Sequence, residues 1–246
     1  MNLIIDIGNT RAKLAVFKNN QLLKTAVCHK EELKKTEEAL LNEFPLIADG
    51  IIANVASPEE TYKKVFATLQ GLQINLSSKT PVPFINSYHS QDTLGLDRIA
   101  LAAAAVTQFP GKDTLVIDTG TCITYDIITA NNNYLGGAIS PGVNMRYRSL
   151  NNFTANLPLL RAKHTTLKKI GQTTKEGLRL GVMQGTIFEI EGFIAHFEKD
   201  FPNLTTVLTG GDAKILSKSL KNTIFVPQNF LLIGLNHILE YNKLNG

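Results

Sequence analysis

The order of apolar and polar positions repeats itself along the chain. Each half begins with an apolar strand that ends in an acid and a glycine-containing corner, followed by two alternating strands joined by an asparagine turn. The predicted strands are 3–6, 13–17 and 22–27 in the first half, and 115–118, 123–128 and 134–139 in the second. The corner acids Asp6 and Asp118 are 112 positions apart. A repeat of this kind predicts a duplicated unit.

After each meander the apolar period changes to that of a helix, with a further apolar strand in each half. The predicted helices are 31–44, 57–69, 96–108, 174–199 and 230–241, and the further strands are 50–55 and 205–209. The stretch 156–169, which contains Pro158, is the predicted long loop. This alternation predicts an α/β fold with mixed sheets flanked by helices. We expect two halves, 1–113 and 114–246, that face each other across a cleft.

Composition removes several classes of protein. With 246 residues, 43% hydrophobic and 19% charged, the chain can bury a sizeable core and is not disordered. The net charge of +4 is scattered rather than gathered into a stripe, so we expect no nucleic-acid partner. Neither a signal peptide nor a membrane-length apolar run is present, and the two cysteines lack a CxxC spacing. These features predict a cytoplasmic protein without a membrane partner.

The first candidate for chemistry is the corner Asp6-Ile7-Gly8-Asn9-Thr10. Glycine lets the backbone approach a phosphate closely, and amides with a hydroxyl can donate to its oxygens. Asp6, at the end of the strand, could hold Mg²⁺ through water. An ordinary hairpin turn accounts for the same residues.

Two more corners strengthen the phosphate hypothesis. Asp118-Thr119-Gly120-Thr121 supplies the same groups from the second half. The segment 209–212, Thr-Gly-Gly-Asp, follows an apolar strand, and its glycines would let a flat ring such as adenine lie against the backbone. By itself this segment is also consistent with a strand-to-helix turn in which Asp212 is near an N-cap. Together, the three corners predict an ATP site.

At this point the sequence resembles the type III pantothenate kinases, of the acetate and sugar kinase/Hsp70/actin superfamily. The resemblance covers nearly the whole chain, and its six pieces occur in one order. They are Asp-Ile-Gly-Asn-Thr-Arg-Ala-Lys (6–13), Gly-Leu-Asp-Arg (95–98), Asp-Thr-Gly-Thr-Cys-Ile-Thr-Tyr-Asp (118–126), Gly-Gly-Ala-Ile-Ser-Pro-Gly (136–142), Gly-Gln-Thr-Thr (171–174) and Thr-Gly-Gly-Asp (209–212). Cys122 stands where the family often has alanine, a small substitution from which we expect little consequence.

The resemblance implies duplicated ribonuclease H-like (actin-like ATPase) domains and ATP-dependent phosphorylation of pantothenate, the first step of coenzyme A biosynthesis. The ATP contacts that it implies are Asp6, Ile7, Gly8, Asn9, Thr10, Arg11, Ala12, Lys13 and Thr121. The pantothenate site that it implies is lined by Tyr88, Gly95, Leu96, Asp97, Arg98 and Thr174. Asp97 would be the catalytic base, and Asp118 the ligand of an activating K⁺ or NH₄⁺. The resemblance also implies a homodimer in which Thr174 reaches the neighbouring subunit's substrate, and no tight feedback by coenzyme A.

The residues themselves are compatible with these roles, and plainer explanations stay open. Asp97 should lie in the first turn of a helix, where an acid also simply complements the helix dipole. Arg98 is suited to a substrate carboxylate, but it could equally be a solvated helix charge. Two rival functions remain at this stage: another small-molecule kinase of the superfamily, and a nucleotide-binding regulator without turnover.

Overall fold

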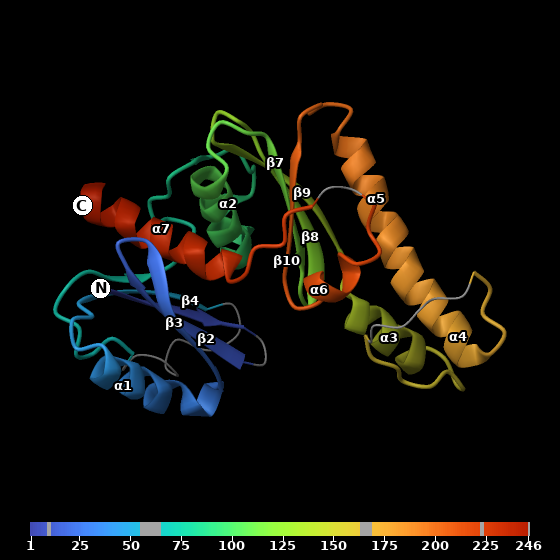
Figure 1. Cartoon of the computed structure of the whole chain (residues 1–246), viewed down its shortest axis with the longest axis horizontal. Coiled ribbons are helices and arrows are strands. Elements are labelled where there is room, and N and C mark those ends of the chain that lie inside the picture. Colours follow the sequence, from blue (N-terminus) through green and yellow to red (C-terminus); the bar gives the residue numbers. More distant parts are fainter. Residues whose placement is uncertain (9–10, 55–64, 163–168, 222–223, 246) are drawn as a thin grey trace. The chain divides into compact units, whose positions relative to one another are not determined.

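The computed structural model describes residues 1–8, 11–54, 65–162, 169–221 and 224–245 (Figure 1). The chain divides into two compact units. Unit 1 comprises Met1–Pro110 and Asn229–Gly246, and unit 2 comprises Gly111–Gln228. The end of the first segment lies close to the predicted boundary at 113. The C-terminal helix, which the sequence prediction placed in the second half, belongs to unit 1, because its apolar side packs on elements of that unit.

Unit 1 is built on a five-stranded sheet with the order β3-β2-β1-β4-β5. Strand β1 is antiparallel to β2 and parallel to β4. The strands of the unit are β1 (Asn2–Ile7), β2 (Arg11–Lys18), β3 (Gln21–His29), β4 (Asp49–Asn54), β5 (Gln73–Asn75) and β6 (Ile85–Asn86). Its helices are α1 (Leu33–Glu43), α2 (Leu96–Gln108) and α7 (Phe230–Asn245), with short 3₁₀ turns at Lys30–Glu32 and Gln91–Thr93.

The period-two alternation of strand β1 determines what each of its faces contacts. Leu3, Ile5 and Ile7 point into an apolar cluster that includes residues of α1. The alternate positions point to the opposite face, where α7 and α2 contact the sheet. Asn2 lies on this second face and donates to Asn236 of α7 at 2.7 Å. Asp6 is therefore directed to the face that carries α2, away from α1.

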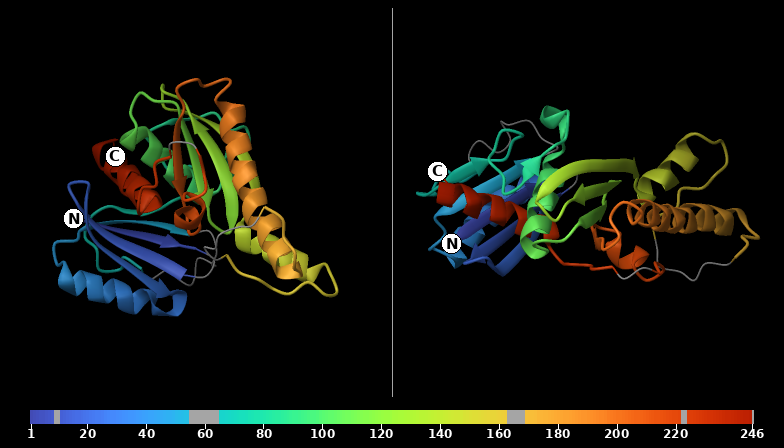
Figure 2. Two further views of the ribbon diagram at one scale, coloured as in Figure 1. Left: turned by 45° about the vertical axis from the view of Figure 1, so that its right-hand side comes forward. Right: turned by 90° about the horizontal axis from the view of Figure 1, so that it is seen from above.

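Helix α7 is held on unit 1 by close packing and by charge. Gly234 lies against α2 so closely that a Cβ there would be 1.8 Å from the carbonyl oxygen of Ala100. Lys243 forms an ion pair with Asp49 of β4 at 2.7 Å. The two helices lie side by side in both Figure 1 and Figure 2. The position of α2 within unit 1 thus depends on a helix that is remote in sequence.

Unit 2 repeats the strand order of unit 1, with β10-β7-β8-β9 corresponding to β4-β1-β2-β3. Strand β7 is antiparallel to β8 and parallel to β10. The strands are β7 (Thr114–Thr119), β8 (Cys122–Ile128), β9 (Asn133–Pro141) and β10 (Thr205–Thr209). The helices are α3 (Val143–Asn152), α4 (Thr174–Arg179), α5 (Gly185–Phe197) and α6 (Ala213–Leu216), with a π-helical turn at Leu180–Gln184. The predicted duplication is confirmed by this topology.

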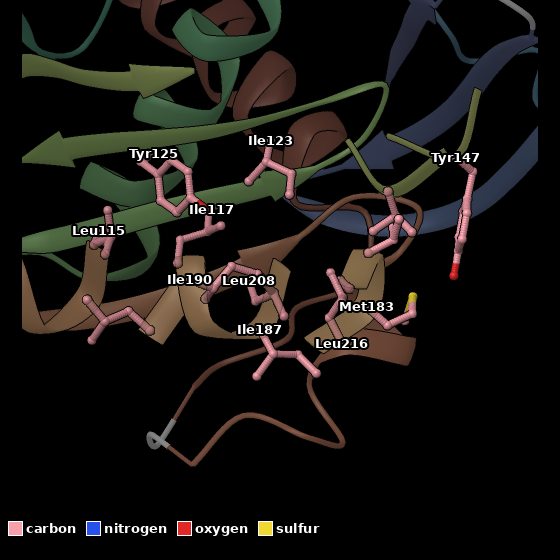
Figure 3. Packing of buried hydrophobic residues seen from close by; sticks show 14 of the residues in the cluster. Leu115, Ile117, Ile123, Tyr125, Tyr147, Met183, Ile187, Ile190, Leu208 and Leu216 are labelled. Atoms are coloured by element: carbon pink, nitrogen blue, oxygen red, sulfur yellow. The ribbon is translucent and has the colours of Figure 1, made fainter. Parts of the chain in front are cut away.

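The core of unit 2 lies on one face of its sheet. Side chains from β7 and β8, such as Ile117 and Tyr125, pack against Ile187 and Ile190 of α5 (Figure 3). Asp118 and Thr124 alternate with these core residues and so point to the opposite face. Strands β1 and β7 even share one burial pattern, in which the corner acid is the only residue of the strand that is not buried.

Most predicted elements are present, and the differences have local causes. The helix at 96–108 and the strand at 205–209 match the prediction residue for residue. The helix expected at 174–199 is interrupted by the π-helical turn, which is followed by Gly185, and it ends at Phe197. Helix α3 and strands β5 and β6 were missed. The predicted helix from 57 falls mainly on residues outside the described ones, and 65–68 form turns.

The described parts of the predicted loop at 156–169 contain neither helix nor strand. Within the described residues, no helix combines the length and the apolar character that crossing a membrane requires.

Candidate active site

The first corner joins β1 to β2 in unit 1. The Gly8 amide donates to the carbonyl oxygen of Arg11 at 3.1 Å, which closes the turn. Asp6 and Lys13 stand directly opposite each other on the ladder, so their side chains share one face. The side chains of Ile7 and Ala12 are buried in the core, which leaves only their backbone for a ligand. Asn9 and Thr10, also predicted to contact ATP, lie outside the described residues.

The electrostatics of Asp6 connect the corner to helix α2. Burial is the largest influence and raises the pKa of Asp6 to about 6, while Lys13 lowers it and Asp97 raises it further. Asp97 therefore lies near enough for the two carboxylates to repel each other. Unit 1 by itself brings the predicted phosphate corner and the predicted base together.

Asp97 occupies the first turn of α2, as the sequence predicts. Its Oδ1 accepts a hydrogen bond from the amide of Arg98 at 2.8 Å, which fixes the carboxylate at the helix start. Gly95 is the N-cap, and a Cβ there would lie 2.4 Å from the same oxygen. The glycine that precedes the helix is thus the residue that leaves space for the carboxylate.

Arg98 is not the solvated charge that one interpretation of the sequence proposed. Only 5% of its surface is exposed, and its guanidinium carbon lies 5.4 Å from the centre of the Tyr88 ring. A cation above an aromatic face at this distance is attracted by the ring. Two residues of the predicted pantothenate site, Tyr88 and Arg98, are therefore in contact. Leu96, two positions before Arg98, is half-buried.

The second and third corners form one site in unit 2. The Thr119 hydroxyl donates to the carbonyl oxygen of Thr209 at 2.8 Å, and the Asp212 amide donates to the carbonyl oxygen of Thr119 at 3.0 Å. Gly210 has a φ of +94°, and a Cβ there would lie 2.2 Å from Oδ1 of Asp118. This position requires glycine both for its backbone conformation and for the space that the carboxylate occupies.

Asp212 occupies the N-cap position that the alternative interpretation predicted, but it does not cap the helix through its side chain. Asp212 precedes α6, but its side chain makes no capping hydrogen bond. Burial raises the pKa of its carboxyl above the ordinary range. Its backbone amide, which bonds to Thr119, is what joins the two corners.

The two threonines predicted from the motifs are both exposed in unit 2. Thr121 follows Gly120 in the second corner, whose turn is closed by a 3.0 Å bond from the Gly120 amide to the carbonyl oxygen of Cys122. Thr174 is the first residue of α4, and its neighbour Thr173 is the N-cap, accepting from the amide of Glu176 at 3.3 Å. Sequence reasoning overlooked Thr173, although threonine three positions before glutamate is typical of a capping box.

A polar cluster that the sequence did not reveal stands apart from these corners. Glu189 of α5 accepts hydrogen bonds from Tyr125 and Ser140 and is ion-paired with Arg146 of α3. These hydrogen bonds and Arg146 hold the pKa of Glu189 below its ordinary value even though burial acts in the opposite direction. Arg146 is therefore engaged within unit 2, where it fastens α3 to α5.

Side chains that could hold ions are present at both acid corners. Asp6 is half-buried and ionised above about pH 6, as a ligand of Mg²⁺ through water would be. Asp118 lies close to Gly120 and Gly210, and its carboxylate occupies the space that a Cβ at Gly210 would fill. Its oxygens are ligands that suit a hard cation. No group of three or more His, Cys, Asp or Glu side chains in the described part of the chain is arranged to hold a metal.

The duplicated meanders, each with an acid and a glycine at its first corner, define the fold class of this protein as the actin-like ATPase fold. Two solved structures with low identity show the same fold. A glucokinase from an Antarctic psychrotroph is 14% identical, with 98% of this chain and 99% of that chain covered and a TM-score of 0.50. A ROK hexokinase from Thermus thermophilus is 13% identical, with 99% of each covered and a TM-score of 0.51.

The family is shown by sequence. The family model of type III pantothenate kinases matches residues 2–196. A type III pantothenate kinase of Christiangramia forsetii is 48% identical over 99% of both chains, and one of Flavobacterium johnsoniae is 46% identical over 98% of both. The chain belongs to the type III pantothenate kinase family. Membership in this family supports the pantothenate kinase that the motifs predicted over the two rival functions.

Proposed function

We propose that this protein transfers the γ-phosphoryl group of ATP to the 4′-hydroxyl of pantothenate, in the first step of coenzyme A biosynthesis, with Asp97 as the catalytic base. The family supplies the activity, the alcohol acceptor and the nucleotide. The observation that carries the residue assignment is the proximity of Asp97 to Asp6 within unit 1. An acceptor hydroxyl at Asp97 would thereby lie beside the phosphate corner.

Asp97 would orient the pantothenate hydroxyl and accept its proton as the phosphoryl group is transferred. Its carboxylate is already fixed by the Arg98 amide, so little reorganisation is needed. Because the transition state of phosphoryl transfer is loose, most of the acceleration should come from positioning and charge neutralisation rather than from proton removal.

Pantothenate recognition falls to the residues around the start of α2. Arg98, buried and held over Tyr88, has the planar fork that binds a carboxylate through two hydrogen bonds. Gly95 and Leu96 would form the wall of this site. We further propose that Thr174, exposed at the start of α4, contributes its hydroxyl.

We propose contacts with ATP in each unit. In unit 1 these are the backbone around Gly8, the exposed Arg11 and Lys13, and Asp6 acting on Mg²⁺ through water. In unit 2 the exposed Thr121 hydroxyl is available at the second corner. Mg²⁺ supplies charge neutralisation of the phosphates when bound. The buried side chains of Ile7 and Ala12 support the corner, and their contacts with ATP would be through the backbone alone.

Asp118 would hold the activating monovalent cation, K⁺ or NH₄⁺. Gly210 leaves room for the carboxylate of Asp118, whose oxygens are the ligands that a hard cation prefers, and this supports the role. Such a cation would supply positive charge at the corner of unit 2. Asp118 itself would fix where that charge is placed.

We also propose a homodimer in the cytoplasm. Large apolar side chains of unit 2 support an interface, since Phe188 of α5 and Ile139 of β9 are 63% and 62% exposed. Light scattering coupled to size-exclusion chromatography would give the mass. Mixing Asp97→Asn with Thr174→Val subunits would then test whether Thr174 serves the neighbour's substrate, because only mixed dimers would regain a complete site.

The decisive assay measures ADP release together with ³¹P NMR of the product. ADP should form only when pantothenate is present, and the new phosphorus signal should be that of a phosphate monoester on the 4′-oxygen. A panel of sugars and short acids serves as the comparison. Turnover of a sugar in preference to pantothenate, or ATP binding with no transfer to any alcohol, would contradict the proposal.

A further inference from the structure

The two acid corners differ in the residue that stands across the ladder from the acid. In unit 1, Asp6 is opposite Lys13, whose ammonium lowers the pKa of the carboxyl. In unit 2, Asp118 is opposite Thr124. Because directly opposite residues have their Cβ atoms about 5 Å apart on one face, each partner lies within reach of its acid. The same position therefore holds a fixed cation in one unit and a neutral hydroxyl in the other.

The Thr124 hydroxyl of unit 2 is buried. The residue is 8% exposed, and within the described parts of the chain its Oγ1 has no hydrogen-bond partner. Buried hydroxyls are normally paired, and leaving one unpaired is destabilising. Other buried threonines of unit 2 follow the rule: Thr114 donates to the carbonyl oxygen of Lys112, and Thr119 to that of Thr209.

Gly210 leaves room for the Asp118 carboxylate itself. A Cβ at Gly210 would lie 2.2 Å from Oδ1 of Asp118, and one at Gly120 would lie 3.7 Å from the same oxygen. The Asp118 carboxylate and the Thr124 hydroxyl, which has no partner among the described residues, place oxygen ligands on one face of the β7–β8 ladder. Oxygen ligands of this kind suit a hard cation.

We propose that Thr124 is a second ligand of the monovalent cation at Asp118, and that this cation stands beside Asp118 as the Lys13 ammonium stands beside Asp6. The inference rests on the cation proposed above for Asp118. K⁺ would accept a lone pair of the Thr124 oxygen, whereas NH₄⁺ would donate a hydrogen bond to it. An ammonium ion has the same chemistry as the head group of lysine. The repeat places Thr124 at the position that corresponds to Lys13.

The first test measures the thermal unfolding midpoint of the full chain against KCl, with tetramethylammonium chloride keeping the ionic strength constant. The wild type should be stabilised by K⁺. Thr124→Val should need about tenfold more K⁺ for the same stabilisation, since one ligand is lost. In K⁺-free buffer the same variant should unfold at a temperature equal to or above that of the wild type, because it removes an unpaired buried hydroxyl.

Matched variants separate this effect from ordinary destabilisation. Thr124→Ser keeps the hydroxyl and should restore the K⁺ response. Thr114→Val makes the same change at a buried threonine at the other end of β7, and should lower the midpoint without changing the response to K⁺. If Thr124→Val responds to K⁺ as the wild type does, the assignment of Thr124 is wrong while the cation at Asp118 stands. If the wild type itself shows no specific response to K⁺, both are wrong.

The second test moves the arrangement of unit 1 into unit 2. Thr124→Lys places an ammonium opposite Asp118, as Lys13 is placed opposite Asp6. A folded Thr124→Lys protein should lose its K⁺-dependent midpoint shift and turn over pantothenate at a rate independent of K⁺. A folded variant that is still stabilised by K⁺ to the wild-type extent would overturn the equivalence. The Thr124→Val titration decides the matter where the lysine variant does not fold.

Discussion

The corners at Asp6 and Asp118 have one backbone frame and two different surroundings. In both, an apolar strand ends in a half-buried acid, turns at a glycine and returns antiparallel. The acid of unit 1 has a lysine across the ladder and the second carboxylate of Asp97 nearby. The acid of unit 2 has glycines on either side and a threonine opposite. The frame places a carboxylate at each corner, and its neighbours decide what that carboxylate does.

The largest expected effect is the loss of turnover when Asp97, the second carboxylate near the unit 1 corner, is replaced. Asp97→Asn should lower kcat at least about 100-fold, because the amide cannot accept the proton and no longer carries the charge that orients the hydroxyl. Steady-state ADP release measures it. Asp92→Asn, an exposed acid of the preceding 3₁₀ turn, is the matched control and should keep turnover. Wild-type turnover by Asp97→Asn would remove the catalytic assignment.

Substitutions at two neighbouring glycines of unit 2 test whether the chain requires the space beside the backbone of Gly210. Gly210→Ala should cost roughly 3 kcal/mol or more of unfolding free energy, because alanine is strained at a φ of +94° and its Cβ meets the backbone of Thr119 as well as Asp118. Gly211→Ala meets nothing within 4 Å and should stay within about 1 kcal/mol. Urea unfolding gives both values. Equal losses would mean that the space at Gly210 is not specifically required.

The raised pKa of Asp6 makes a prediction about stability and pH. A carboxyl whose folded-state pKa lies above its unfolded value favours the folded state at low pH, and that contribution is lost as pH rises through the folded value. Between about pH 4 and 7, Asp6→Asn should therefore gain stability relative to the wild type, by about 3 kcal/mol. Urea unfolding across this range measures the difference. A constant difference at all pH values would contradict it.

The smallest expected effect is on the pKa of Asp6, when Lys13 is replaced by the threonine that stands at the corresponding position of unit 2. Lys13→Thr removes the ammonium that lowers the pKa of Asp6, so this pKa should rise. Carbonyl ¹³C chemical shifts of labelled aspartate, followed against pH, would report it. Lys13→Arg keeps the charge and should leave the titration near that of the wild type. An unchanged titration in Lys13→Thr would show that the two corners do not differ through this lysine.

Local patterns accounted for much of the fold. The asparagine turns were predicted correctly, and Asn19, Asn20 and Asn132 adopt the positive φ values that asparagine tolerates. Helix α3 was missed because its charged and polar residues, such as Arg146, obscure a short apolar side. Its stability comes from contacts with α5, including the ion pair with Glu189, which are remote in sequence.

In the candidate site, too, features specified by adjacent residues were predicted, whereas features that depend on distant residues were not. The acids, glycines and the helix start at Asp97 were visible as motifs, because strand ends, turns and caps are specified by a few adjacent residues. The burial of Arg98 beneath Tyr88 and the pairing of Asp118 with Thr124 were not visible. A threonine in a strand has no distinctive pattern, and its partner is decided by the register of the sheet.

What the sequence determined by itself was therefore the repeated order of strands, the two acid corners and the family. Each of these follows from period, spacing and motif over short stretches. Tertiary structure alone decided that α7 closes unit 1, that Asp97 lies near Asp6, and that a buried hydroxyl faces the acid of unit 2. These depend on which surfaces pack together, and packing free energy is a property of contacts between residues far apart in the chain.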